Sequence, residues 1–197
     1  GRTTGIDVGI TRFSTDSRGN IIENPRIWDE HERKMRILQR KLSRQKMGSN
    51  RREQTRIRIA RLHEHIVNSR EDFANKLAHQ YAVDHDMIAA EKLSIKKMAV
   101  KTAETTSVNL RRNIHDVAWR RFRENLKNQC EDHGRTLIEI DPAYTTMTCH
   151  LCGHVQKIEL HERVFRCGGC GCNTDRTYNS ATNIHRRGLE SLQSDGT

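Results

Sequence analysis

Hydrophobic positions recur along this chain with two different periods, which separate expected strands from expected helices. Short apolar or alternating runs bounded by turn residues predict strands, whereas apolar residues three and four positions apart predict helices. A turn over 17–20 and a loop over 94–108 are also expected. The expected strands span 3–10, 12–17, 20–28, 87–93 and 136–140, and the expected helices are a hairpin over 29–82 and single helices over 109–133 and 176–187.

Each of the longer expected helices has a narrow apolar face. Gly48–Asn50 separates the two arms of the hairpin, and Gly134 is expected to end the third helix as a C-cap. Trp119 lies just off the apolar face of that helix and is expected to be a packing residue, as is Cys130 within the face. The faces comprise Met35, Leu38 and Leu42 in the first arm, Ile59, Leu62, Ile66, Phe73 and Leu77 in the second arm, and Leu110, Ile114, Ala118, Phe122, Leu126 and Cys130 in the third helix.

Two Cys-x-x-Cys pairs predict a metal-binding ribbon. Fourteen residues separate the pair Cys149 and Cys152 from the pair Cys167 and Cys170. Such a spacing can present four thiolates at the corners of a tetrahedron, and it is typical of structural zinc. Three neighbouring residues are alternative ligands or bystanders, namely His150, His154 and Cys172.

The order of the expected elements predicts the fold class. Three strands are followed by a helical hairpin, a strand, a helix, a strand, the cysteine ribbon and a last helix. This order is typical of an α/β fold with a ribonuclease-H-like mixed sheet, into which a basic helical hairpin and a C-terminal zinc ribbon are inserted. The expected core spans 1–144 and 173–188, with the hairpin at about 29–82, the ribbon at 145–172 and a tail at 189–197.

The composition of the chain indicates a polyanionic partner. Of the 197 residues, 34% are hydrophobic and 5% are aromatic, which suits a modest core with much exposed helix, and the net charge is +10. No stretch is long and apolar enough to cross a bilayer, so no membrane partner is expected. Paired cysteines without a secretory leader favour a reducing, cytoplasmic and nucleoid-associated setting. Because the chain starts at Gly1 rather than Met, we expect it to be part of a longer protein.

The positive charge is concentrated in the expected hairpin. Residues 33–70 contain thirteen Lys or Arg and two acids, a balance of +11 that leaves the rest of the chain at −1. A solvated helical face is one interpretation. Such faces usually mix both signs of charge, however, and a phosphate polymer would relieve the repulsion here, so nucleic-acid contact is favoured. The best candidates flank the loop between the arms and are Arg44, Lys46, Arg51, Arg52, Arg56 and Arg58.

Three acids fall on elements that a ribonuclease-H-like order brings together. Asp7 lies in the middle of the first strand, Glu91 follows an apolar run, and Asp175 opens the last helix. Each also has a structural alternative, which for Asp175 is an N-cap. Together, the three acids could hold two Mg²⁺ ions about 4 Å apart, one activating water and the other stabilising the leaving oxygen of a phosphodiester.

Five segments occur in order along the chain at 5–9, 41–49, 89–93, 141–149 and 175–179. Together they resemble the TnpB/OrfB family of insertion-sequence proteins. That family is similar to the RuvC nuclease core of the type V CRISPR effectors. The resemblance therefore implies a RuvC-like core, a transposon-encoded RNA-guided DNA endonuclease, and both DNA and a guide RNA as partners. It also implies that the N-terminal half usual in the family lies outside this chain.

The resemblance also assigns roles to single residues. It implies catalytic Mg²⁺ at Asp7 and Glu91 and structural Zn²⁺ at the four paired cysteines. The family has two acids near the start of the last helix. Asp175 matches the first of them, but Thr177 stands where the second, metal-binding acid is expected.

Position 177 decides between an active and an inactive protein. Two helical residues that are two positions apart differ by roughly 200° in direction, so Asp175 cannot simply replace position 177. Thr177 offers a neutral oxygen, which is a weaker Mg²⁺ ligand than a carboxylate. The alternatives to an active nuclease are therefore a nuclease-inactive RNA-guided DNA-binding protein and a decayed transposase remnant. Asn179 and Asn183 could face either the acids or the solvent.

Overall fold

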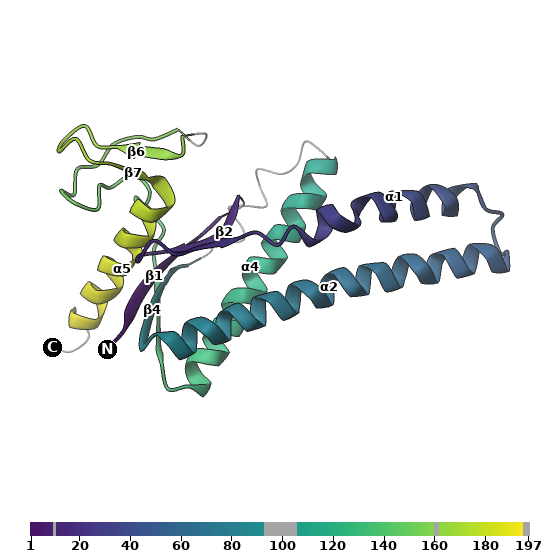
Figure 1. Ribbon diagram of the computed structural model, residues 1–197, viewed down its shortest axis with the longest axis horizontal. Coiled ribbons are helices and arrows are strands. Elements are labelled where there is room, and N and C mark those ends of the chain that lie inside the picture. Colours follow the sequence, from purple (N-terminus) through teal and green to yellow (C-terminus); the bar gives the residue numbers. More distant parts are fainter. Residues whose placement is uncertain (10, 93–105, 160–161, 195–197) are drawn as a thin grey trace.

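A five-stranded mixed sheet forms the centre of the protein (Figure 1). The computed structural model describes residues 1–9, 11–92, 106–159 and 162–194, and of 106–118 only the backbone. The strand order is β3-β2-β1-β4-β5, with β2 antiparallel to both of its neighbours and β1, β4 and β5 parallel. The mixed α/β arrangement expected from the sequence is therefore confirmed. The strands are β1 (Thr3–Val8), β2 (Arg12–Asp16), β3 (Ile21–Glu23), β4 (Met87–Glu91) and β5 (Thr136–Ile140).

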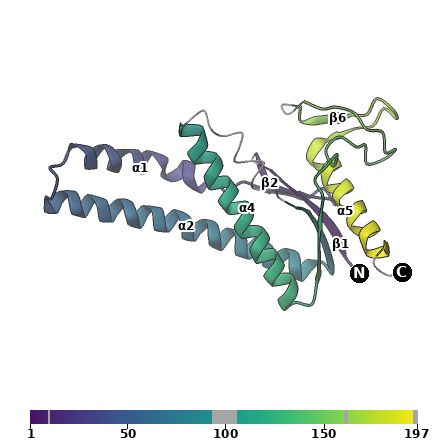
Figure 2. The same cartoon turned by 180° about the vertical axis from the view of Figure 1, so that it is seen from behind.

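Helices cover both faces of the sheet, as the views from the front and from behind show (Figures 1 and 2). Side chains alternate between the two faces of a strand. Ile6 and Ile88 therefore pack on one face against α2 (Asn50–Asp84) and α4 (Thr106–Asp132). On the other face, Ala89 packs against Ile184 of α5 (Arg176–Ser194). The expected packing roles of Trp119 and Cys130 are confirmed, because both side chains are buried in the cluster under α2 and α4.

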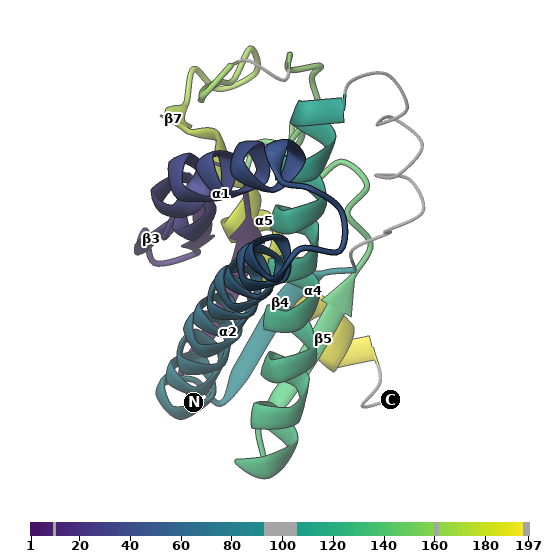
Figure 3. The ribbon, with the colours of Figure 1, turned by 90° about the vertical axis from the view of Figure 1, so that its right-hand side faces the viewer.

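The hairpin of α1 (Ile27–Arg44) and α2 projects from the sheet, and Figure 3 looks along it. Its own core contains the buried side chains of Met35, Leu62 and Ile66. Ser49 begins α2 as an N-cap, since its hydroxyl accepts a hydrogen bond from the Arg52 amide (3.3 Å). The C-terminal part of α2 packs on the sheet through Ala74, Leu77, Ala78 and Tyr81. The same helix thus belongs to the hairpin at one end and to the core at the other.

Some element boundaries differ from those expected. The strand expected over 20–28 is only β3, because Trp28 is buried in the hairpin core and the helix already begins at Ile27. Most of the loop expected over 94–108 lies outside the described residues, but its last three residues are helical. The last helix continues to Ser194, so the expected tail is largely helical. In the part of the chain that the structure describes, no helix has the length and apolarity needed to span a membrane.

Helix α5 packs directly on the backbone of β1 at Gly5, which has no side chain. A Cβ atom at Gly5 would collide with the backbone of Ala181 and His185 in α5. Gly188 in turn faces the Ala89 side chain of β4. Two glycines at this contact therefore set the distance at which the beginning of α5 lies above the ends of β1 and β4.

Candidate functional site

The Asp7 and Glu91 carboxyl groups lie at the ends of neighbouring parallel strands. The register pairs Gly5 with Ala89 and Ile6 with Ala90, so that Asp7 and Glu91 follow as the next pair. Since Ile6 and Ile88 face α2 and α4, the alternation of side chains directs Asp7 and Glu91 to the opposite face, which α5 covers. The structure therefore brings these two expected site residues together.

Burial raises the pKa of both carboxyl groups. The pKa of Asp7 is raised well above its ordinary value, mainly by burial and further by the Glu91 and Asp175 carboxylates. The positive charge of Arg176 opposes this shift. Burial also raises the pKa of Glu91, against a hydrogen bond donated by the Thr145 hydroxyl and the charge of Arg187. A site with these properties favours a bound cation, because a cation would stabilise both charged forms.

Asp175 caps helix α5. Its Oδ1 accepts hydrogen bonds from the backbone amides of Thr177 (2.8 Å) and Tyr178 (3.2 Å) and from the Thr177 hydroxyl (2.6 Å). Its Oδ2 forms an ion pair with Arg12 (2.9 Å). Burial opposes ionisation of Asp175, but these donors outweigh it and lower its pKa. The N-cap alternative therefore describes the position of Asp175 in this structure.

The hydroxyl of Thr177 faces a neighbour of Asp7. The Thr177 hydroxyl lies 3.1 Å from the Thr15 hydroxyl, and Thr15 is the cross-strand partner of Asp7. Paired residues on antiparallel strands point to the same face, so Asp7, Thr15 and Thr177 lie on the same side of the sheet. Among the described residues, the only group of three or more potential metal ligands whose atoms all lie within 4.8 Å of one another is the set of four cysteines, so the three acids do not converge that tightly.

The raised pKa of Asp7 predicts a specific pH dependence of stability. The folded chain binds the Asp7 proton more tightly than the unfolded chain, whose value is near 3.8, so stability without Mg²⁺ falls as pH rises above about 4. Asp7→Asn removes the charge. In urea unfolding of the zinc-loaded chain without Mg²⁺, we expect the variant to be more stable than the wild type, by more at pH 8 than at pH 5. An equal difference at both pH values would contradict the buried-charge interpretation.

Four cysteines converge in the ribbon. Cys149 Sγ lies 3.7 Å from Cys170 Sγ, and Cys152 Sγ lies 3.6 Å from Cys167 Sγ. A tetrahedral site with metal–sulfur bonds of about 2.3 Å has edges of about 3.8 Å, so the thiols fit such an ion. These four residues could hold a metal ion, and the alternatives His150, His154 and Cys172 do not belong to the cluster that the described residues form.

The backbone around the cysteines forms two matching turns. The Cys149 amide donates to the His154 carbonyl and the Gly153 amide to the Cys149 carbonyl. The second turn repeats both hydrogen bonds, from Cys167 to Cys172 and from Gly171 to Cys167. Gly153 (φ 76°) and Gly171 (φ 74°) take the left-handed conformation that these turns require. The short strands β6 (Val164–Arg166) and β7 (Asn173–Asp175) complete the ribbon.

Two buried asparagines of α5 join the ribbon to the sheet. The Asn179 amide group accepts from the His150 backbone amide (2.9 Å) and donates to the Thr148 carbonyl (2.8 Å). Asn183 donates to the carbonyls of Thr145 (2.9 Å) and Thr148 (2.7 Å). Since the Thr145 hydroxyl donates to Glu91, the asparagines hold the segment that orients this acid. The sequence left the direction of both asparagines open, and it offered no sign of the role of Thr145 beyond its place in the segment 141–149.

Replacing Asn183 with Leu should therefore be costly. The Thr145 carbonyl would lose its buried donor, which costs about 1–3 kcal/mol for an unsatisfied group, whereas the Thr148 carbonyl would keep the hydrogen bond from Asn179. We expect a lower free energy of unfolding in urea and faster amide exchange over 145–150. Asn68→Leu on the exposed surface of α2 is the control, and an equally small effect of both substitutions would show that the asparagine bonds are unimportant.

The basic residues expected to contact nucleic acid divide into two groups. Arg52 donates from Nη1 to the Leu42 and Gln45 carbonyls at the end of α1, and Arg56 pairs with Glu53 (2.7 Å). These two side chains therefore contribute to the hairpin itself. The remaining candidates are exposed, and they are Arg44, Lys46, Arg51 and Arg58.

Two family models match the sequence of this chain. Residues 1–102 match the OrfB_IS605 model, described as a probable transposase, and residues 119–184 match the TNB domain of the Cas12f1-like family. A cryo-EM structure of a Cas12f1-sgRNA-target DNA complex is also similar, with a TM-score of 0.63 and 19% sequence identity over 92% of this chain and 49% of the other. That likeness shows a shared fold.

Two curated relatives are similar over nearly the whole chain. A Streptomyces pristinaespiralis protein named "Putative RNA-guided DNA endonuclease" is 36% identical over 191 residues, which cover 94% of this chain and 45% of that protein. An Escherichia coli protein named "Putative RNA-guided DNA endonuclease InsQ" is 32% identical over 190 residues, which cover 91% of this chain and 47% of that protein. The chain thus spans less than half the length of these relatives. Because the OrfB_IS605 model covers more than half of the chain, we conclude that the chain belongs to this family of probable transposases.

Proposed function

We propose that this chain is the nuclease core of a transposon-encoded, RNA-guided DNA endonuclease of the TnpB type. The observation that carries the proposal is the pair of carboxyl groups, Asp7 and Glu91, at the ends of neighbouring parallel strands beneath α5. The names of the two curated relatives and the sgRNA and target DNA of the similar complex support it. DNA and a guide RNA are the partners that follow.

The strand order supports a ribonuclease-H-like (RuvC) core for this proposal. Three antiparallel strands followed by two parallel ones, with helices on both faces, agree with that fold class. The core then comprises 1–144 and 173–188, the basic hairpin is inserted within it, and 145–172 is a zinc ribbon with Zn²⁺ on its four cysteines.

Asp7 and Glu91 are suited to hold Mg²⁺, because carboxylate oxygens are the ligands that this ion prefers. A bound Mg²⁺ would supply activation of water and stabilisation of the leaving oxygen of a phosphodiester. The chain's own residues set the site: Thr145 orients Glu91, and Arg176 adds positive charge close to Asp7. Because Gly5 lets α5 pack directly on β1, Asp7 and Glu91 lie beneath the start of α5.

The test is cleavage of DNA by the protein assembled with its guide RNA in Mg²⁺. We expect cutting of a matching target, no cutting of a mismatched target, and loss of cutting in Asp7→Asn and Glu91→Gln. Cleavage that persists in both variants would contradict the assignment of the acids. Failure to cut a matching target that is demonstrably bound would contradict an active nuclease.

A second candidate is a nuclease-inactive, RNA-guided DNA-binding protein. The observation in its favour is that a neutral residue, Thr177, contacts the cross-strand partner of Asp7, while Asp175 is engaged as a helix cap. The wild type would then bind its target at the same guide-directed position without cutting it.

A further inference from the structure

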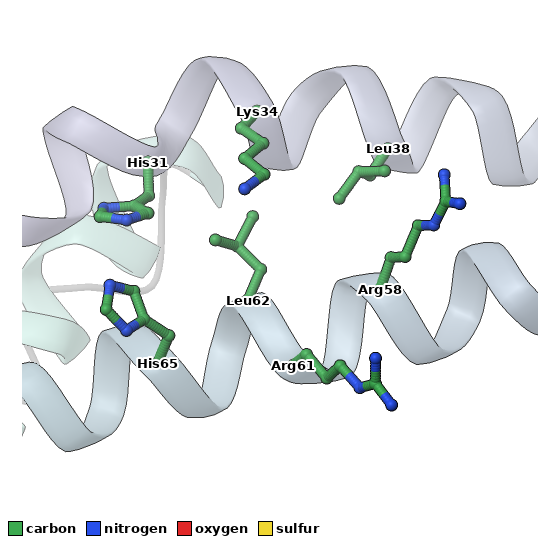
Figure 4. Close-up of a pocket in the computed structure, with 7 residues that line it drawn as sticks. All are labelled: His31, Lys34, Leu38, Arg58, Arg61, Leu62 and His65. Carbon is green, nitrogen blue, oxygen red and sulfur yellow. The ribbon is translucent and has the colours of Figure 1, made fainter.

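A basic notch lies in the middle of the helical hairpin, between α1 and α2 (Figure 4). It has a volume of about 460 Å³. Three cationic side chains line it, Lys34 from α1 and Arg58 and Arg61 from α2. Two imidazoles, His31 and His65, stand opposite each other at one end. We refer to this site as the hairpin notch.

The three cations of the hairpin notch are free of ion pairs within the part of the chain that the structure describes. No ion pair of Lys34, Arg58 or Arg61 occurs among the described residues, and all three side chains are exposed. Glu30 and Glu64 each lie one helical turn from a notch cation, Lys34 and Arg61 respectively, but neither acid forms an ion pair with it among the described residues, and Glu53 lies on the opposite side of α2 from Leu62. Glu53 is moreover paired with Arg56. The three cations are therefore available to bind an external anion.

The rest of the notch suits a phosphodiester backbone. The rings of His31 and His65 are 5.1 Å apart, and His31 Nδ1 lies 2.9 Å from the Ile27 carbonyl, which fixes that ring. Imidazole N–H groups donate readily to phosphate oxygens. Leu38 packs on the hairpin core beside the buried Leu62, so the bottom of the notch is apolar and can receive the carbon face of a sugar.

We propose that the hairpin notch binds the phosphodiester backbone of a nucleic acid strand, with the phosphates on Lys34, Arg58 and Arg61. The inference deepens the proposed function, on which it rests for the presence of a nucleic acid. It differs from the sequence-based expectation, which placed the contacts around the loop at the tip. Of the six residues expected there, only Arg58 lines the notch, whereas Arg52 and Arg56 are used within the hairpin.

The experiment compares two variants of the zinc-loaded chain that lose the same charge. The control removes three exposed cations from the opposite side of α1, a surface that also carries Asp29 and Glu32. Fluorescence anisotropy measures binding of labelled duplex DNA and of single-stranded RNA of the same sequence between about 50 and 200 mM salt. The notch variant is Lys34→Ala with Arg58→Ala and Arg61→Ala, and the control is Arg33→Ala with Arg36→Ala and Arg40→Ala.

Three lost phosphate contacts should reduce the slope of log affinity against log salt by about 2–3, whereas the control should change it by less than about 1. If the notch variant lowers this slope for only one of the two probes, duplex DNA or single-stranded RNA, that probe identifies the kind of nucleic acid that the notch binds. Equal slopes for the two variants on both probes would overturn the proposal. This binding measurement does not depend on cleavage. A wild type that binds nucleic acid through the notch but does not cut DNA with its guide RNA would therefore refute the proposed nuclease function and leave the notch proposal standing.

Discussion

The Thr177→Asp variant is expected to cleave a matching DNA target about 100-fold faster than the wild type, when each is assembled with guide RNA in Mg²⁺. A carboxylate at this position would lie on the same side of the sheet as Asp7, through the contact that Thr177 makes with Thr15. A carboxylate is a stronger Mg²⁺ ligand than the Thr177 hydroxyl. A 100-fold increase in the cleavage rate corresponds to about 2.7 kcal/mol of additional transition-state stabilisation.

Thr177→Asn is the matched control for this prediction. Asn has nearly the shape of Asp but no charge, so it should not raise cleavage. The rate is measured from the appearance of labelled product under single-turnover conditions. Equal gains with Asp and Asn would point to a packing effect, and no gain with Asp would show that position 177 is not the missing ligand.

The second large effect is expected in the ribbon. Cys167→Ser should abolish Zn²⁺ binding at the proposed site, because structural zinc sites contribute about 10–16 kcal/mol of binding free energy that depends on the complete ligand set. We expect the metal content to fall from about one zinc per chain to near zero, and the segment 145–172 to lose its protection from amide exchange. Since Asn179 bonds to Thr148 and His150 in the first turn, the beginning of α5 should lose protection too.

Cys172→Ser distinguishes the ligand set from its neighbour. Cys172 packs beside the cluster but is not one of the four converging thiols. Its substitution should leave the zinc content and the amide-exchange protection of the ribbon unchanged. A variant at Cys172 that loses zinc as completely as Cys167→Ser would show that the metal is held by a different set of thiols.

The sequence predicted those parts of the fold that depend on local patterns. The order of strands and helices, the apolar face of the hairpin and the packing of Trp119 and Cys130 follow from side-chain periodicity, and the structure confirms them. The convergence of the four cysteines followed from their spacing. The predicted boundary between β3 and α1 was wrong because Trp28 is buried against the second arm of the hairpin. The local sequence pattern around Trp28 gives no sign of this long-range contact.

The candidate site was harder to predict, because its geometry depends on how α5 lies on the sheet. The competing roles of Asp175 differ only in the direction of one side chain, and Arg12, distant in sequence, favours the capping role. The contacts of Thr177 with Thr15 and of Thr145 with Glu91 join segments far apart in the chain. No sequence pattern marks hydroxyl groups in such positions, so their roles can be recognised only from the tertiary structure.

The most direct test of the central claim is a Mn²⁺ titration of the zinc-loaded chain, followed by the electron paramagnetic resonance of free Mn²⁺. Mn²⁺ prefers the same oxygen ligands as Mg²⁺. We predict binding that weakens about tenfold or more in Asp7→Asn and in Glu91→Gln but is nearly unchanged in Asp175→Asn, because Asn also caps helices well. Equal Mn²⁺ affinity in the wild type, Asp7→Asn and Glu91→Gln would contradict the account.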